Sequence, residues 1–185
     1  MPKRRSDIIF ILTISVLFWL ISFPLNQWFC ESMPRHQIMQ IPLMLGLGIV
    51  SGWRYSKHFI IGVSWSIAIL VFIISSIIFW MLPHSIDYAV INTSFNRVMH
   101  INMFVAGFLI FLTLKHTLFE IRILFLGMVT AMMIATGITL LTYNLLLCSA
   151  FTIDQQKETG TQLIIIGLIL FATTLFVFFR GLGRR

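Results

Sequence analysis

The chain has 185 residues, of which 58% are hydrophobic and only 10% are charged, and its mean hydropathy is +0.96. This composition excludes a soluble globular domain, because apolar runs of about 20 residues are long enough to cross a bilayer and the chain holds several of them. The formal net charge of +7 does not indicate nucleic-acid binding, since the basic residues gather at the ends of apolar segments, as membrane topology requires.

Six apolar segments follow one another with short connections, which leave no room for a separate soluble domain. We therefore predict an all-α polytopic membrane protein, a bundle of about six helices that forms a single domain over residues 1–185. The predicted transmembrane helices are residues 8–23, 37–52, 59–82, 99–114, 123–147 and 161–179. We expect the first helix to be retained rather than cleaved as a signal peptide, because no small-residue cleavage site follows it.

The distribution of Lys and Arg indicates the orientation of these helices. If the N-terminus is cytoplasmic, only Arg35, Arg97 and Lys157 fall on the outer side, and all other basic residues fall inside. This asymmetry follows the positive-inside rule, and the inner basic residues also attract anionic lipid. We therefore predict a multi-pass protein of the cell membrane with both termini in the cytoplasm.

The second segment opens with His, Met and Gln side chains at helical spacing. His36, Met39, Gln40 and Met44 fall at positions i, i+3, i+4 and i+8, so a regular α-helix places them on one face. Pro42 lies among them and is expected to bend the helix and free a backbone carbonyl. Imidazole, thioether and amide groups on one stripe can coordinate a soft metal. The alternative interpretation is ordinary packing between membrane helices.

The fourth segment carries a similar pair, His100 and Met103, about one turn below the outer surface. An ionisable residue inside a membrane helix is costly and is therefore a functional candidate, although a neutral His that is hydrogen-bonded to Thr or Asn costs little. The second and fourth segments run in the same direction, and packed helices lie about 8–10 Å apart. If the two are neighbours, we expect the imidazoles of His36 and His100 within about 10 Å of each other, with Met39 or Met103 beside them. These residues place the functional face on the extracytoplasmic side.

The two cysteines, Cys30 and Cys148, both fall on the outer side, so a disulfide between them is open, but we expect free buried thiols. Asn92 begins an Asn-Thr-Ser sequon on the same side, which is a glycosylation acceptor only in some compartments. The sequence holds no nucleophile–base arrangement, no HExxH motif and no phosphate-binding loop. All its acidic residues fall in loops or at helix ends, which argues against proton-coupled transport. We therefore expect a protein that is not an enzyme.

Four blocks of the sequence resemble, in order and spacing, the CtaG family of integral-membrane proteins that assemble haem–copper cytochrome oxidases. The blocks are Ser22–Leu25 followed by His36, then Trp80–Pro83, His100–Gly107 and Asp154–Gln156. They resemble the family patterns SPL…HM-x-QH, WHLP, EH-x-x-F-x-x-AG and DQQ. The chain departs from these patterns where Gln40 and Met81 stand in place of histidines and Met99 in place of an acidic residue. The chain also resembles a shortened member, without the first helix of full-length proteins.

The resemblance implies a membrane-integral assembly factor that handles copper for a haem–copper oxidase or a related copper-dependent enzyme. The implied metal ligands are His36 and His100 with neighbouring methionines, for which the candidates are Met39, Met44, Met81 and Met103. Cu(I) is soft and accepts few imidazole and thioether ligands, so a transient site of this kind suits metal transfer. A non-catalytic accessory subunit of a larger membrane metalloenzyme is the alternative function, and haem b held between the two histidines is a further alternative.

Overall fold

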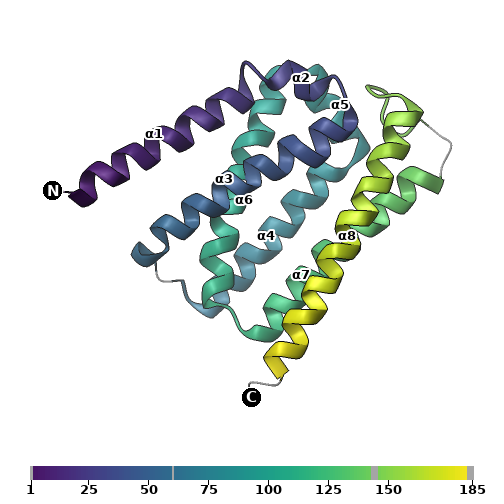
Figure 1. The fold of residues 1–185 in the computed structure, drawn as a ribbon. Helices are drawn as coiled ribbons and strands as arrows, with labels where there is room; N and C mark the ends of the chain where they lie inside the picture. Colours follow the sequence, from purple (N-terminus) through teal and green to yellow (C-terminus); the bar gives the residue numbers. More distant parts are fainter. Residues whose placement is uncertain (1, 60, 143–145, 183–185) are drawn as a thin grey trace.

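Every regular element in the described part of the chain is a helix, which confirms the all-α prediction (Figure 1). The structure is a computed structural model that describes residues 2–59, 61–142 and 146–182. Its elements, in chain order, are α1 (Pro2–Ser22), α2 (Asn26–Cys30), the π-helical turn η1 (Arg35–Gln40), α3 (Ile41–Tyr55), the 3-10 turn η2 (Ser56–His58), α4 (Val63–Met81), α5 (Pro83–Ile91), α6 (Thr93–His116), α7 (Phe119–Thr142) and α8 (Ile153–Leu182).

Five of these helices are long and apolar enough to cross a membrane, namely α1, α4, α6, α7 and α8. The remaining predicted segment, residues 37–52, is divided because the 6-residue η1 runs directly into the 15-residue α3. Together they form one uninterrupted helical segment of about the length that a bilayer requires. The chain is therefore a multi-pass membrane protein with helical segments at all six predicted positions, and apolar side chains on their outer surfaces contact lipid.

Pro42 accounts for the change of helical geometry at the start of this segment. Because Pro42 has no N–H, it cannot donate to the carbonyl four residues earlier, and the Ile41 N–H instead reaches back five residues to the His36 carbonyl. The wider turn changes the direction of the residues that precede it. Met39 consequently points outward and is 43% exposed, whereas His36 and Gln40 are fully buried. The expectation that all of them share one face is therefore wrong for Met39.

The predicted helix boundaries miss the polar first turns of two helices. α6 begins at Thr93, six residues before the predicted start, and the Asn92 side chain caps it by accepting hydrogen bonds from the Ser94 and Phe95 N–H groups. α8 begins at Ile153, eight residues before the predicted start. Hydropathy locates the apolar part of a helix but not the polar turns that extend beyond the hydrocarbon. The predicted end of the fifth helix includes residues 143–145, which lie outside the described residues.

Glycines bring α3 and α6 into close contact. Gly48 packs on the backbone of Phe104, and one turn further a Cβ added at Gly52 would lie 2.6 Å from the Phe108 carbonyl oxygen. Gly107 of α6 packs in turn on the backbone of Leu45. Both helices advance by four residues between contacts, so they run parallel in a constant register. These two helices, with α4 packed on α6, form the centre of the bundle.

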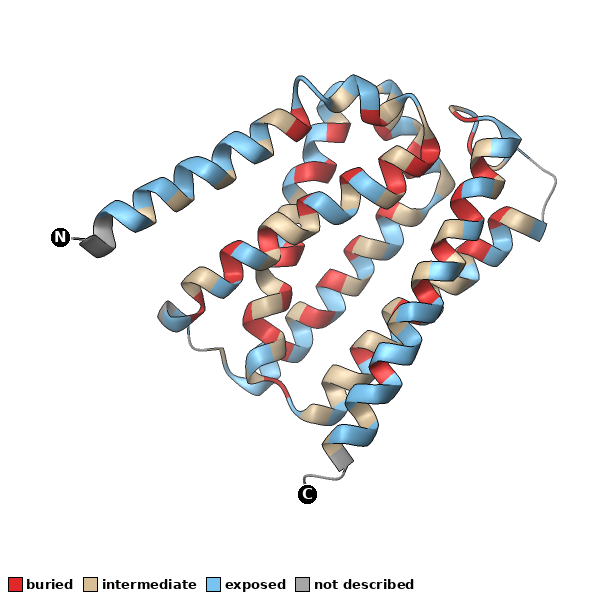
Figure 2. Ribbon diagram, in the orientation of Figure 1, coloured by how far each residue is buried: buried red, intermediate tan, exposed pale blue. Residues whose placement is uncertain are grey.

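α7 and α8 pack mainly on each other as an antiparallel hairpin beside this centre (Figure 1). Gly137 and Gly160 lie at their crossing, where a Cβ added at Gly137 would be 2.7 Å from the Gly160 carbonyl oxygen. Buried residues concentrate between α3, α4 and α6 and at one end of the bundle, whereas α1 is exposed along most of its length (Figure 2). This end holds α2, α5 and the connection between α7 and α8, and it is called the outer end here because the sequence predicts it to be extracytoplasmic.

Candidate functional site

A buried polar cluster occupies the outer end of the bundle, where η1 and α3 lie beside α6. Its members are at most 1% exposed, and they are His36, Gln40, Asn96 and His100. Three buried methionines, Met44, Met99 and Met103, belong to one hydrophobic core cluster in the same helices. We call the four polar residues, and not the methionines, the histidine cluster. Both histidines therefore face the protein interior. The segments that carry them are neighbours, which is the condition under which the two imidazoles were expected to lie close together.

The register of α3 and α6 shows which members lie at the same level. Gly48 lies against Phe104, so one turn toward the outer end Met44 lies at the level of His100. One turn further, Gln40 lies at the level of Asn96, which agrees with the hydrogen bonds that both amides donate to Asn26. His36 is joined to this level through its Nδ1, which lies 2.7 Å from the Gln40 Oε1.

Gln40 connects η1 to two other elements through its side-chain amide. Its Nε2 donates to the Asn26 Oδ1 of α2 at 2.9 Å and to the Ile21 backbone carbonyl at the end of α1 at 3.4 Å. A backbone carbonyl can only accept, so this contact fixes which end of the amide carries the hydrogens. The amide oxygen of Gln40 therefore faces the His36 ring.

This orientation determines the tautomer of His36. The distance between His36 Nδ1 and Gln40 Oε1 is 2.7 Å, and because the oxygen can only accept, Nδ1 carries the proton. Nε2 of the neutral ring then keeps its lone pair, and it is buried without a hydrogen-bond partner among the described residues. A metal-ligating histidine requires a hydrogen-bond acceptor at one ring nitrogen and a free lone pair on the other.

His100 lacks partners on both sides of its ring. Its Nδ1 and Nε2 are buried, and neither makes a hydrogen bond within the described part of the chain. The Oδ1 of Asn96, one turn away on the same face of α6, is also buried and has no partner in the described ranges. Each buried polar atom without a partner costs about 1–3 kcal/mol, so these atoms point to a ligand or ordered water at this position.

Asn26 and Asn96 are members of the site that the sequence analysis missed. The Asn26 Oδ1 accepts hydrogen bonds from Gln40 Nε2 at 2.9 Å and from Asn96 Nδ2 at 2.7 Å, which ties α2 to both η1 and α6. Asn96 Nδ2 also lies 3.3 Å from the Cys30 Sγ. The available signal was their spacing, since Asn96 precedes His100 by one helical turn.

The chemistry of this site is that of a neutral, soft-donor environment. No group of three or more His, Cys, Asp or Glu side chains that could hold a metal occurs within the described residues, so a metal here must also use thioether sulfur. Burial raises the pKa of the Cys30 thiol to about 11, although its hydrogen bond with Asn96 acts in the opposite direction. The thiol is therefore protonated at neutral pH and does not supply a resting thiolate.

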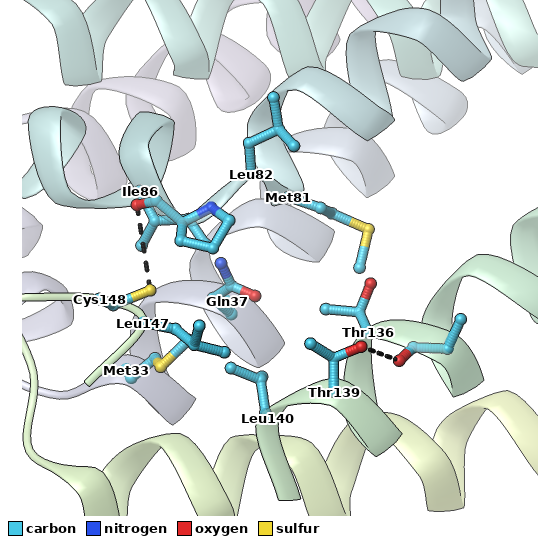
Figure 3. Close-up of a pocket in the computed structure, with 12 residues that line it drawn as sticks. Met33, Gln37, Met81, Leu82, Ile86, Thr136, Thr139, Leu140, Leu147 and Cys148 are labelled. Carbon is cyan, nitrogen blue, oxygen red and sulfur yellow. Dashed lines mark hydrogen bonds between the residues drawn. The ribbon is translucent and has the colours of Figure 1, made fainter. Parts of the chain in front are cut away.

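The structure divides the other predicted ligands between two places. Met44 and Met103 lie in the core beside the histidine cluster, whereas Met81 lies elsewhere. Met81 lines a cavity of about 230 Å³ between the end of α4, η1 and α7, together with Met33 and Cys148 (Figure 3). The structure therefore does not bring Met81 together with the two histidines.

The cysteines are both free, and they belong to different parts of the core. Cys30 neighbours the histidine cluster, while Cys148 is buried in the connection between α7 and α8. Burial and the nearby Asp87 carboxylate raise the pKa of the Cys148 thiol to about 12. Both cysteines are accordingly neutral thiols. The prediction that they are free is confirmed, whereas the prediction that they are buried holds for Cys148 but not for Cys30, which is only partly buried.

Comparisons of the chain with protein-family models, with curated proteins and with solved structures find no match.

Proposed function

We propose that this chain is a membrane-integral assembly factor that holds Cu(I) transiently at the histidine cluster and transfers it to a haem–copper oxidase or a related copper-dependent membrane enzyme. The observation that carries the proposal is the pair of buried histidines, His36 and His100. Within the described residues, the Nε2 of His36 and both ring nitrogens of His100 lack hydrogen-bond partners, and the buried Met44 and Met103 belong to the adjoining core. The four blocks that resemble the CtaG family support the same function.

The donor set favours Cu(I) over harder cations. Imidazole and thioether are ligands for soft or borderline metals, and Cu(I) accepts low coordination numbers. The His36 Nε2 and one nitrogen of His100 would bind the ion, with Met44 or Met103 as the sulfur donor. Gln40 would orient His36 because its Oε1 accepts a hydrogen bond from the Nδ1–H group. Copper, when bound, would be cargo of the protein rather than a catalyst.

The absence of negative charge among the proposed ligands fits transfer better than storage. A cation that is buried among neutral groups is not compensated, so the site would bind Cu(I) more weakly than a thiolate site. A haem between the two helices is less compatible with the packing, because the contacts of Gly48 and Gly107 with the facing backbones hold α3 and α6 together within one to two turns of His100. A single ion needs no such separation.

The test is uptake of Cu(I) by the detergent-purified protein under reducing conditions, in competition with a chromogenic Cu(I) chelator. We expect the wild type to bind Cu(I) and the His36→Ala/His100→Ala double variant to lose this binding. His84→Ala is the matched control, because His84 is exposed on α5 and should not contribute. Equal uptake by the wild type and the double variant would overturn the proposal.

An accessory subunit without metal is the second candidate function, and the arrangement of α1 favours it. α1 leaves grooves along the bundle, one of them lined by Ser15, Phe18 and Phe104, and a partner helix could fill such a groove. Mild detergent extraction and native electrophoresis distinguish the two functions. An accessory subunit migrates in equal amounts with the mature enzyme, whereas an assembly factor is absent from it.

A further inference from the structure

A cavity separate from the histidine cluster lies between the end of α4, η1 and α7 (Figure 3). Its volume is about 230 Å³, and no described residue that lines it is charged. Leu82, Ala135 and Thr139 line the cavity and are also exposed on the surface of the bundle. Since α7 crosses the membrane, the cavity opens toward the lipid, and its occupant must be neutral and soluble in the bilayer.

Gln37 provides a specific polar group in this otherwise apolar space. Its side chain points into the cavity between Cys148 and Met81 (Figure 3). The residue is only 6% exposed, and its Nε2 has no hydrogen-bond partner within the described part of the chain. A buried amide donor that lacks a partner destabilises the fold. A ligand with an acceptor oxygen at this position would remove that cost.

The lining indicates the shape of the molecule that carries this oxygen. Met33 and Met81 face the cavity from opposite walls (Figure 3), and thioether sulfur makes favourable contacts with aromatic and related flat rings. An apolar cavity of about 150 Å³ accepts benzene, while sites for drug-sized ligands begin at about 300 Å³. A volume between these values fits a head of one or two rings.

We propose that this cavity binds a small neutral ring that bears a carbonyl oxygen, the chemistry of a quinone head group, with the Gln37 amide as the donor to that oxygen. The Thr136 hydroxyl, which lines the cavity from α7, is available to the oxygen on the opposite side of a para-dicarbonyl ring. Substituents attached to the ring extend through the opening beside Leu82 into the bilayer. The site is independent of copper binding, because Gln37 lies on a different face of η1 from the His36–Gln40 pair.

Two probes of equal size separate recognition of the oxygen from filling of the cavity. Duroquinone is tetramethyl-1,4-benzoquinone, and durene is the same tetramethyl ring without oxygens. All ring carbons of duroquinone are substituted, so the Cys148 thiol cannot add to it. Binding is measured from the concentration dependence of the melting temperature in detergent, followed by the loss of helical circular dichroism.

We expect duroquinone to stabilise the wild type, and we expect Gln37→Leu to weaken duroquinone binding about fivefold to tenfold, as the loss of one buried hydrogen bond implies. Durene binding should be unchanged or tighter in Gln37→Leu. Ala135→Leu fills the cavity and should abolish binding of both probes. Ala131→Leu is the matched control, because Ala131 is exposed one turn away on α7 and does not line the cavity.

Three results would overturn the proposal. The first is the absence of any effect of duroquinone on the wild type, and the second is duroquinone binding that persists in Ala135→Leu. The third is an equal change of duroquinone and durene binding in Gln37→Leu, which would mean that the cavity holds an apolar chain without recognition of oxygen. The His36→Ala/His100→Ala variant should keep its affinity for duroquinone, so this test and the copper test fail or succeed separately.

Discussion

Two buried glutamines in the same turn, Gln37 and Gln40, provide a direct test of the hydrogen-bond network. Gln40 is fully buried and its amide makes hydrogen bonds to His36, Asn26 and Ile21. Gln37 is 6% exposed, and its Nε2 makes none among the described residues. Replacing each by Leu removes the same amide group from the same helical turn. The difference in stability between the two variants therefore reports the hydrogen bonds of Gln40 and not the general effect of a Gln-to-Leu substitution.

The expected magnitudes follow from the partners that each variant leaves behind. Gln40→Leu leaves the His36 Nδ1–H buried without an acceptor and removes one of the donors to Asn26, which should lower the free energy of unfolding by about 2–4 kcal/mol. Gln37→Leu removes a donor that has no partner, so it should leave stability unchanged or raise it by about 1 kcal/mol. Gln40→Leu should also weaken Cu(I) binding by about 10- to 100-fold, because the orientation of His36 is lost.

The assay is unfolding in mixed micelles with increasing sodium dodecyl sulfate, followed by circular dichroism in the absence of added ligand. Cu(I) affinity is measured on the same preparations with the chromogenic chelator. Equal destabilisation by the two substitutions would refute the assigned network. Loss of stability in Gln40→Leu without loss of Cu(I) affinity would refute the role of His36 as a ligand, while leaving the network intact.

Three further predictions concern other features of the fold. Cys30 should react slowly with an alkylating reagent at pH 7, and its rate should rise about tenfold per pH unit up to its raised pKa of about 11; a rate that levels off near pH 8.5 would contradict this. Gly107→Ala should lower the free energy of unfolding by about 1–3 kcal/mol, because the added methyl group separates α3 from α6. Gly46→Ala, with nothing within 4 Å of the added Cβ, should leave the free energy of unfolding unchanged or raise it by up to about 1 kcal/mol. Similar unfolding curves for the two variants would argue against the close contact of α3 and α6. Asp87→Ala should speed hydrogen exchange of the Ala150 amide, which donates to Asp87 Oδ1 at 3.0 Å, and an unchanged exchange rate would exclude this role.

The general architecture, and the location of both histidines at one end of the bundle, could be predicted because they depend on local and additive properties of the sequence. Hydropathy located the helical segments, and the alternating direction of successive spans made the second and fourth parallel. Once these two are neighbours, His36 and His100 both fall at the outer end, although the register of the glycine contacts places His36 about two turns above the level of His100. Glycines in both segments allow the close packing that makes them neighbours.

Other parts of the site depend on helix distortion and on packing between distant segments, which a periodic sequence pattern does not contain. Met39 was misplaced because Pro42 changes the helical geometry, and a periodic pattern assumes that this geometry is constant. Asn26 lies in a short helix outside the apolar segments, so its contacts depend on how the connection between α1 and η1 folds back. Met81 lines the cavity because the end of α4 meets α7 at the outer end, which depends on packing that the sequence pattern does not contain.

The attachment of the α7–α8 hairpin has a mechanical consequence. At the outer end, Asp87 of α5 accepts hydrogen bonds from the backbone of Ser149 and Ala150, and at the opposite end Phe125 of α7 belongs to the core that contains Ile73 of α4. The cavity lies between these attachments and next to the outer one, because Leu147 and Cys148 line it. Where the hairpin faces the cavity, it has fewer packed side-chain contacts to lose on moving than it has at either attachment. The α7 wall of the opening is therefore the part of the hairpin that is displaced at the lowest free-energy cost when a molecule enters from the bilayer.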